Sequence, residues 1–418
     1  MMTTSRLGLR PFHFLGGACL LAMAPAATAQ QADAASELQA QEAAKDRANG
    51  YVDLQGSLGY TTNASQGTDE DGSIFGRASI LGFYSIDGDR SSTSLSAFAE
   101  NSFYPNRNGS SNTQLARADV RHSYRASESV TVFGGVEASV DFGSLLSTRY
   151  LPAPDPTTGV PPVVVIDPAL FGSRQRSYRL GGNLGTTLRV TERDNLTMSA
   201  TGQKVWYEDD ISGLGFRNIS AQASWDRILS ERSTVGLRLI GQDTDYRAPG
   251  LGNNVYTALG TLSRDLAENW RIKLGVGASY SIRKALTGRD KSVSPAADVQ
   301  VCKSTEFENF CGALSHDVQT TIGANATRAT TASFFYSRRL SRNDSIDARA
   351  AASHYRGDDD YRVNYLSGGA AYSRRFSDRF SGGVDVSARD IYYRDGPNVP
   401  VELTGLIFLR YRIGDIKQ

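Results

Sequence analysis

The stretch WRIKLGVGASYSIR (residues 270–283) alternates apolar and polar residues without a break. One side of an extended chain would carry Trp270, Ile272, Leu274, Val276, Ala278, Tyr280 and Ile282. The other side would carry Arg271, Lys273, Ser279, Ser281 and Arg283, together with two glycines. Because successive side chains of a strand point to opposite faces, this period of two predicts a β-strand with one apolar and one polar face.

The same alternation recurs in residues 130–142, 178–190 and 401–413. These strands are about twelve residues long, whereas soluble strands usually have about five or six. A soluble β-sandwich would also alternate, but the pattern runs from residue 51 to the C-terminus without a helical interruption. Length and continuity together favour a closed sheet in a membrane.

Eight short polar turns divide the alternating runs at nearly even spacing. They are DGDRS (87–91), RASES (125–129), TERDN (191–195), SERS (230–233), LAEN (266–269), STEFEN (304–309), SRND (341–344) and FSDR (376–379). If both ends of the barrel lie on one rim, eight short turns imply about eighteen strands. The predicted fold is all-β: a transmembrane, antiparallel, up-and-down β-barrel with short turns on one rim and longer loops on the other.

Aromatic residues gather towards the predicted strand ends, where amphipathic rings would mark a membrane boundary. They are Tyr60, Phe83, Tyr84, Phe103, Tyr104, Trp206, Tyr207, Trp270, Tyr355, Tyr361, Tyr392 and Tyr393. Scattered surface aromatics are the alternative interpretation.

The first 29 residues have the features of a secretory signal peptide. Arg6 and Arg10 precede an apolar run, and Ala27-Thr28-Ala29 supplies small residues for cleavage. We therefore expect a signal peptide at 1–29, a periplasmic N-terminal extension at 30–49 and an outer-membrane β-barrel at 50–418. The expected location is the outer membrane of a Gram-negative bacterium.

Two segments outside the alternating runs have open interpretations. Residues 30–49 are rich in Ala, Gln and Glu, and are either a docking segment for a periplasmic partner or a solvated leader. The connection Gly143–Arg174 contains six prolines and the apolar run 163–166. Connections this long are usually functional or disordered. This one would constrict the lumen, cap the barrel mouth or pair with a neighbouring subunit.

Cysteine use fits an oxidising compartment. Cys19 lies within the signal peptide, which leaves Cys302 and Cys311 on either side of the sixth turn. This spacing predicts a loop-closing disulfide in an exported protein. A metal site would need more ligands than His316, the one histidine nearby.

The alternation also predicts which charged residues face the lumen. The cations are Arg77, Arg117, Arg121, Arg179, Arg189, Arg238, Arg271, Lys273, Arg349, Arg389, Arg410 and Arg412. The acids are Glu100, Asp119, Glu137, Asp141, Asp226, Asp385 and Glu402. Each cation could simply pair across strands and hold the wall. A surplus of arginine would favour anionic or hydroxyl-rich solutes.

The sequence contains no motif that indicates an enzyme, a cofactor or nucleic-acid binding. After signal removal His122, His316 and His354 remain, on different predicted strands or turns. His122 and Ser123 are adjacent, which places them on opposite faces of a strand. There is no phosphate loop, no distinctive carboxylate pair and no clustered basic surface.

The chain resembles proteobacterial outer-membrane β-barrel porins that accompany exopolysaccharide export systems. The resemblance covers residues 50–418 and rests on SRRLSRNDS, YSRRFSDRF and the terminal LTGLIFLRYRI. It implies a channel that receives polysaccharide from a periplasmic export protein. Outer-membrane lipid and the barrel-assembly machinery are further expected partners.

Three functions follow as hypotheses. The first is a channel that passes exopolysaccharide across the outer membrane. The second is a passive diffusion porin for small anionic or sugar solutes. The third is a structural or adhesive barrel plugged by its own loop.

Overall fold

The computed structural model describes residues 49–64, 71–105, 112–142, 176–208, 215–248, 251–285, 288–320, 326–357, 362–394 and 399–414. These ranges hold eighteen strands: β1 (Asn49–Thr61), β2 (Ser73–Asp87), β3 (Ser91–Phe103), β4 (Thr113–Arg125), β5 (Val130–Phe142), β6 (Arg176–Arg189), β7 (Asp194–Tyr207), β8 (Phe216–Ser230), β9 (Ser233–Tyr246), β10 (Gly252–Ala267), β11 (Trp270–Ala285), β12 (Gly288–Ser304), β13 (Glu308–Thr320), β14 (Ala326–Arg339), β15 (Asp344–Arg356), β16 (Arg362–Arg375), β17 (Phe380–Tyr393) and β18 (Glu402–Gly414). Within these ranges no helix is long and apolar enough to cross a membrane.

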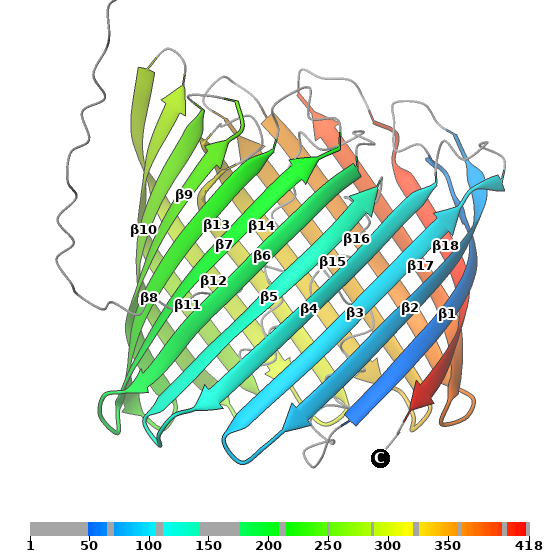
Figure 1. Ribbon diagram of the computed structural model, residues 1–418, viewed down its shortest axis with the longest axis horizontal. Helices are drawn as coiled ribbons and strands as arrows, with labels where there is room; N and C mark the ends of the chain where they lie inside the picture. Colours follow the sequence, from blue (N-terminus) through cyan, green and yellow to red (C-terminus); the bar gives the residue numbers. More distant parts are fainter. Residues whose placement is uncertain are drawn as a thin grey trace, which may run out of the picture.

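The sheet closes on itself. Each strand pairs with the next strand in the chain, and β1 lies beside β18 (Figure 1). The two strands pair antiparallel, with Gln55 opposite Arg410. Closure gives every described strand two hydrogen-bonded neighbours. The predicted fold is confirmed as a closed, antiparallel barrel of eighteen strands.

The eight predicted short turns join β2 to β3, β4 to β5 and so on around the barrel, along the lower rim in Figure 1. The barrel begins at Asn49, one residue before the predicted boundary. Residues 1–48 and the connection 143–174 lie outside the described residues. The signal peptide, the N-terminal extension and the role of that connection therefore remain expectations.

The outer face is apolar along most of its height. Val276 and Val293 expose 69% and 68% of their surface, although they lie in the middle of their strands, where a soluble protein would bury them. The shortest strands have 13 residues. At about 3.3 Å per residue and a tilt of about 40°, such a strand rises about 33 Å, enough to cross a hydrocarbon core of about 30 Å.

Aromatic side chains ring the outer face near both ends of the strands. Near the loop side lie Tyr60, Phe103, Tyr178, Trp206, Tyr256, Tyr280 and Tyr392. Near the short turns lie Tyr84, Tyr124, Trp270, Phe310, Tyr336, Tyr372, Phe380 and Tyr411. Two such girdles around an apolar band are typical of outer-membrane barrels.

Part of the sequence-based aromatic assignment is wrong. Five of the predicted boundary residues project into the barrel instead: Phe83, Tyr104, Tyr207, Tyr355 and Tyr393. For four of them the reason is the strand period: in a pair of adjacent aromatic residues only one can face outward. Tyr355 has no Phe, Tyr or Trp neighbour in sequence, and the register of β15 turns it inward. Tyr361 lies outside the described residues.

Candidate pore lining

The inner face of the barrel is identified by contacts between strands that are not neighbours. Arg238 on β9 and Asp298 on β12 form an ion pair at 3.5 Å, although β10 and β11 lie between them. Side chains can reach over two strands in this way only on the concave side of the sheet. The residues that share their face along each strand therefore line the lumen.

The strand register places all the charged residues predicted for the lumen on this inner face. The cations are Arg77, Arg117, Arg121, Arg179, Arg189, Arg238, Arg271, Lys273, Arg349, Arg389, Arg410 and Arg412. The acids are Glu100, Asp119, Glu137, Asp141, Asp226, Asp385 and Glu402. Arg189 and Arg271 lie next to the short turns, and the others lie at varied heights along the wall.

Most of these cations are neutralised by carboxylates on the same wall. The pairs are Arg77 with Glu100 (3.4 Å), Arg117 with Glu137 (2.7 Å), Arg121 with Asp119 (3.5 Å), Arg238 with Asp298 (3.5 Å), Arg271 with Asp265 (2.7 Å), Arg349 with Asp385 (3.1 Å), Arg412 with Asp53 (2.6 Å), and Arg389 with Glu402. Except for Arg121–Asp119, which lies within β4, the pairs join different strands from the inside, as expected of cross-strand charges.

The expected cation surplus is reduced by seven inward-facing acids that the sequence analysis left out. They are Asp53, Asp87, Asp265, Asp290, Asp298, Asp317 and Asp347. Their alternation could have found them: Asp53, for example, follows Val52 and precedes Leu54 in a clean period of two. Arg283, which was assigned to the polar face of its strand, pairs with Asp290 at 2.8 Å. Arg125, Arg339 and Arg375 also face inward, at the short-turn ends of their strands. Among the described residues, cations on the inner wall therefore outnumber acids only slightly.

Small residues on the inner face make room for the longer ion pairs. A Cβ added to Gly275 on β11 would lie 2.3 Å from Oδ1 of Asp298. That carboxylate can approach Arg238 because β11, one of the two strands between them, carries no side chain at this point. Similarly, β16 presents Gly369 opposite Arg349 and Ala371 opposite Asp385. These small residues let the side chains of Arg349 on β15 and Asp385 on β17 meet across β16. The glycines of these strands thus shape the lumen wall.

One sector of the wall is dominated by uncharged polar groups. We call the following residues of β7 to β10 the hydroxyl–amide sector: Asn195, Thr197, Ser199, Thr201, Gln203, Asn218, Ser220, Gln222, Ser224, Thr234, Gln242, Thr244, Asn253, Thr257, Thr261 and Ser263. Hydrogen bonds link some of them, as between Thr201 and Ser220 (3.4 Å) and from Asn218 Nδ2 to Thr244 Oγ1 (2.9 Å). The sector therefore offers donors and acceptors along the height of the barrel.

Most of the inner ion pairs gather on another part of the circumference, from β15 through β18 and β1 to β5. Arg349–Asp385, Arg412–Asp53 and Arg117–Glu137 belong to this group. Three other pairs lie on β9 to β12: Arg238–Asp298, Arg271–Asp265 and Arg283–Asp290. The inner wall thus has a sector rich in paired charges and a sector rich in neutral hydrogen-bonding groups. Of these two sectors, only the one with paired charges could be predicted from the charged residues of the sequence.

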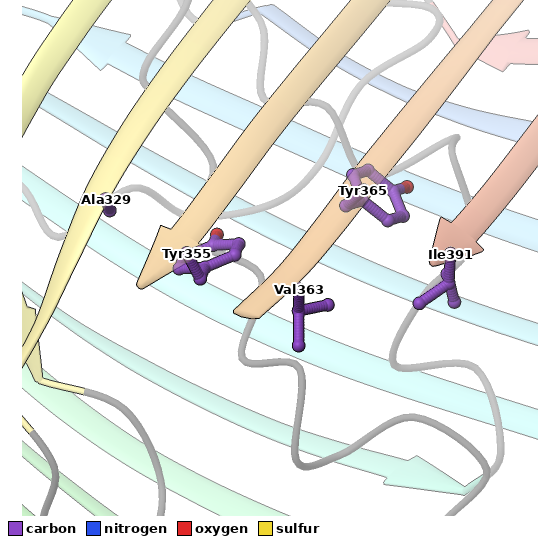
Figure 2. Packing of buried hydrophobic residues seen from close by; sticks show 5 residues of the cluster. All are labelled: Ala329, Tyr355, Val363, Tyr365 and Ile391. Atoms are coloured by element: carbon purple, nitrogen blue, oxygen red, sulfur yellow. The ribbon is translucent and has the colours of Figure 1, made fainter. Parts of the chain in front are cut away.

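Apolar clusters thicken the inner wall near the loop side. Ala329, Tyr355, Val363, Tyr365 and Ile391 project from β14 to β17 and are buried together (Figure 2). A second cluster joins the loop-side ends of β1, β2 and β3 to β18 and contains Phe75, Tyr104 and Phe408 among its members. The sequence analysis missed these clusters because it assigned apolar residues to the lipid face by default.

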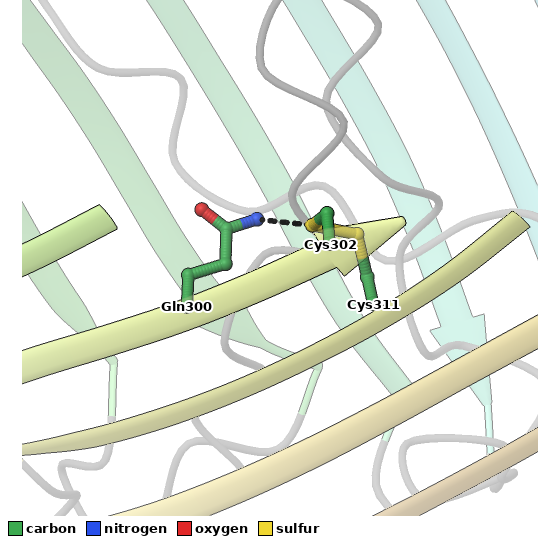
Figure 3. Close-up of a disulfide and its surroundings, with 3 residues drawn as sticks. All are labelled: Gln300, Cys302 and Cys311. Atoms are coloured by element: carbon green, nitrogen blue, oxygen red, sulfur yellow. Dashed lines mark hydrogen bonds between the residues drawn. A yellow bond between two sulfur atoms is a disulfide. The ribbon is translucent and has the colours of Figure 1, made fainter. Parts of the chain in front are cut away.

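Cys302 and Cys311 are bonded to each other (Figure 3). They lie directly opposite on β12 and β13, on the inner face near the short turn between these strands. The Gln300 amide contacts Cys302 Sγ at 3.1 Å. The disulfide closes the hairpin on the short-turn side.

The three histidines of the described residues lie apart from this wall, on the outer face. Their ring nitrogens contact Thr93 (His122, 2.8 Å), Thr330 (His316, 2.8 Å) and Asn364 (His354, 2.7 Å). Among the described residues, no three side chains of histidine, cysteine or acid type gather as a metal site would require. The polar chemistry of the inner face is accordingly that of ion pairs, hydroxyls and amides.

No family model matches the chain, and no curated protein matches it. Solved structures align with it at low identity. OccK2 (OpdF) of Pseudomonas aeruginosa is 10% identical, with 88% of this chain and 98% of that chain covered at a TM-score of 0.47. OccAB4 of Acinetobacter baumannii is 8% identical, with 88% and 99% covered at a TM-score of 0.45.

The FrpB iron transporter of Neisseria meningitidis (F3-3 variant) is 11% identical at a TM-score of 0.45. The alignment covers 85% of this chain and 64% of that chain, so the chain spans less than two thirds of the transporter. The assignment to a closed barrel rests on the pairing of β1 with β18 and does not depend on these alignments.

Proposed function

We propose that the barrel spans the outer membrane of a Gram-negative bacterium and conducts polar solutes through it. The closed ladder satisfies backbone groups inside a bilayer, where an open sheet edge would cost several kcal/mol per unpaired group. The apolar outer face and its two aromatic girdles match the thickness of a hydrocarbon core. The barrel-assembly machinery and outer-membrane lipid are the partners that this location implies.

The finer proposal is that the solute is an exopolysaccharide delivered by a periplasmic export protein. The observation that carries it is the hydroxyl–amide sector on β7 to β10. A polysaccharide presents many hydroxyl groups, each able to donate and accept, and a wall of Ser, Thr, Asn and Gln can exchange hydrogen bonds with them at successive heights. Eighteen strands also leave an aqueous lumen, whereas about eight would be filled by side chains.

The test in cells is deletion of the gene. The polymer should disappear from the cell surface while its synthesis continues, because the barrel acts on passage and not on synthesis. Normal surface polymer in the deletion strain would contradict the proposal.

The test on purified protein uses single-channel current in planar bilayers with a neutral oligosaccharide added. Thr201→Val, Gln222→Leu and Gln242→Leu together remove hydrogen-bonding groups from the hydroxyl–amide sector at nearly constant volume. We expect shorter blocking events in this variant. The matched control is Ser79→Ala with Ser94→Ala, which removes hydroxyls from the inner face of β2 and β3. If both variants shorten the blocking events equally, the hydroxyl–amide sector does not bind the oligosaccharide preferentially, and the finer proposal loses its support.

A second candidate is a passive diffusion porin for small solutes, favoured by the sector of paired charges. Arg117–Glu137 and Arg349–Asp385 place both signs of charge along one side of the lumen. Such a wall can orient small charged or zwitterionic molecules as they pass. A deletion strain with normal polymer and a growth defect on a small solute would support this function.

A further inference from the structure

One aromatic ring of the inner wall is open to the lumen near the short turns. Phe133 shares the inner face of β5 with Glu137 and lies close to the beginning of that strand. Its side chain is only partly buried. Inward rings near the loop side are packed away instead: Phe75 and Tyr355 are 1% and 0% exposed. Phe133 therefore offers aromatic surface to a solute in the lumen.

A glycine on the neighbouring strand lets this ring lie along the wall. Gly185 on β6 is directly opposite Phe133, and a Cβ added to it would lie 2.3 Å from Cζ of the ring. The ring thus extends across β6 where that strand has no side chain. Ser199 on β7, the next residue across the sheet, is 1% exposed, as expected beneath such a cover. A ring that lies along the wall turns one of its faces to the lumen.

Polar side chains occupy the next inward positions around the ring. On its loop side, Arg121 of β4 and Asn183 of β6 each lie opposite Gly135, which leaves the space between them free of a side chain. The Arg121 side chain is 53% exposed. On the short-turn side lies Thr187 of β6, whose hydroxyl oxygen is 3.3 Å from that of Thr197 on β7. The ring is therefore bordered by a guanidinium, an amide and hydroxyl groups.

This combination fits the two kinds of surface of a pyranose ring. The faces of such a ring carry C–H bonds and are apolar, whereas its hydroxyls project from the edge. The negative face of an aromatic ring attracts C–H groups. Amides and hydroxyls can both donate to and accept from the sugar hydroxyls, and a guanidinium fork can donate to two of them at once. A flat apolar solute would use only the ring, and a small ion only the polar border.

Two other inward rings have different surroundings. Phe335 on β14 lies between Cys311 and Arg349, of which the first is in the disulfide and the second in an ion pair. The ring of Tyr51 on β1 is covered by the guanidinium of Arg412, whose carbon lies 4.0 Å from the ring centre. Neither ring combines an open face with a border of amide and hydroxyl groups, so Phe133 is the stronger candidate for contact with a sugar.

We propose that Phe133, Arg121, Asn183 and Thr187 form a binding site for one pyranose ring of a polysaccharide, at the short-turn end of the lumen. The inference rests on the proposed function and deepens it, because it places the first contact of the polymer where a chain delivered from the periplasm would enter. The hydroxyl–amide sector begins on β7, the strand after Gly185. A sugar that leaves the ring of Phe133 would meet its hydroxyls and amides next.

The test measures equilibrium binding of cellohexaose to the purified protein in detergent micelles, by saturation-transfer NMR with irradiation of aromatic protons. Phe133→Leu removes the aromatic face but keeps an apolar side chain, and affinity should fall about three- to tenfold. Phe133→Trp keeps an aromatic face and should bind within about twofold of the parent. Asn183→Leu removes the amide beside the ring and should lower affinity about threefold, which provides a second test if Phe133→Leu folds poorly.

The matched control is Phe335→Leu, which removes an inward ring half the circumference away. Its affinity should stay within about twofold of the parent, as expected for distant sites. No binding of cellohexaose to the parent protein, unchanged affinity in Phe133→Leu and Asn183→Leu, or an equal loss in Phe335→Leu would overturn the proposal. Unchanged affinity together with loss of surface polymer in the deletion strain would count against this site alone. The expected loss of affinity together with normal surface polymer would support the site and count against export alone.

Discussion

The pair Arg349–Asp385 should contribute more to stability than any exposed pair of the outer wall. Its two side chains are 10% and 7% exposed, and the closest nitrogen and oxygen are 3.1 Å apart. The comparison is Arg217–Asp245, which is equally close at 2.9 Å but 61% and 39% exposed. The perturbation is the set Arg349→Gln, Asp385→Asn and the double variant, with the equivalent set for Arg217 and Asp245.

The expected magnitude follows from burial. Two unit charges 3.1 Å apart attract by about 5 kcal/mol at an effective dielectric constant of about 20. Desolvation of both groups offsets much of this attraction. We therefore expect a net coupling energy of about 1.5–3 kcal/mol for Arg349–Asp385, in the range of charged hydrogen bonds. The exposed pair should couple by about 0.2–1 kcal/mol.

The assay is reversible urea unfolding in phosphatidylcholine vesicles, followed by tryptophan fluorescence. Trp206, Trp225 and Trp270 all lie on the outer wall, so their emission reports insertion into lipid. Coupling energies come from the difference between the double variant and the sum of the single variants. A coupling below about 0.5 kcal/mol for the buried pair, or no excess over the exposed pair, would refute the reasoning from burial.

Three further predictions concern the disulfide, the lumen charges and the orientation. Cys302→Ser with Cys311→Ser should lower the free energy of unfolding by about 2–3 kcal/mol, and peptide mapping of the unreduced parent should find the two cysteines in one linked pair; two free thiols would contradict this. Replacing Arg271, Lys273 and Arg410 by Gln should shift the reversal potential towards cation preference in a salt gradient, because the nearly balanced wall becomes acidic; an unchanged potential would mean that these residues do not face the current. In whole cells, a membrane-impermeant maleimide should label Glu208→Cys on the loop side but not Glu231→Cys in a short turn. Labelling of Glu231→Cys alone would mean that the short turns face the outside of the cell.

The strands and short turns of this barrel could be predicted from sequence because both depend on local patterns. Alternation in 270–283 identified β11, and each polar turn marked one hairpin. The count of eighteen strands then followed from the number of turns and the expectation that both ends of the barrel lie on one rim. Distant pairings such as β1 with β18 needed no separate information, since up-and-down connectivity leaves only one way to close.

The chemistry of the wall could be predicted only in part. Facing direction is a local property, so the predicted lumen residues fall on the inner face. Pairing is not local: Arg238 meets Asp298 across two strands, and no single segment of sequence shows that. The same limit hid the site around Phe133, whose members come from β4, β5 and β6. Charge balance and lumen sites emerge only when strand register is known.

The central claim is that the inner face lines a conducting, water-filled lumen, and neighbouring residues on β8 test it most directly. Ser220 points inward, and Ile219 is 49% exposed on the outer face. The measurement is single-channel conductance of Ser220→Cys and Ile219→Cys before and after a positively charged, water-soluble methanethiosulfonate reagent. We predict that conductance falls for Ser220→Cys and stays constant for Ile219→Cys and for the parent protein, whose Cys302 and Cys311 are bonded to each other. Absence of any channel in the parent protein, or a block of Ile219→Cys equal to that of Ser220→Cys, would contradict the claim.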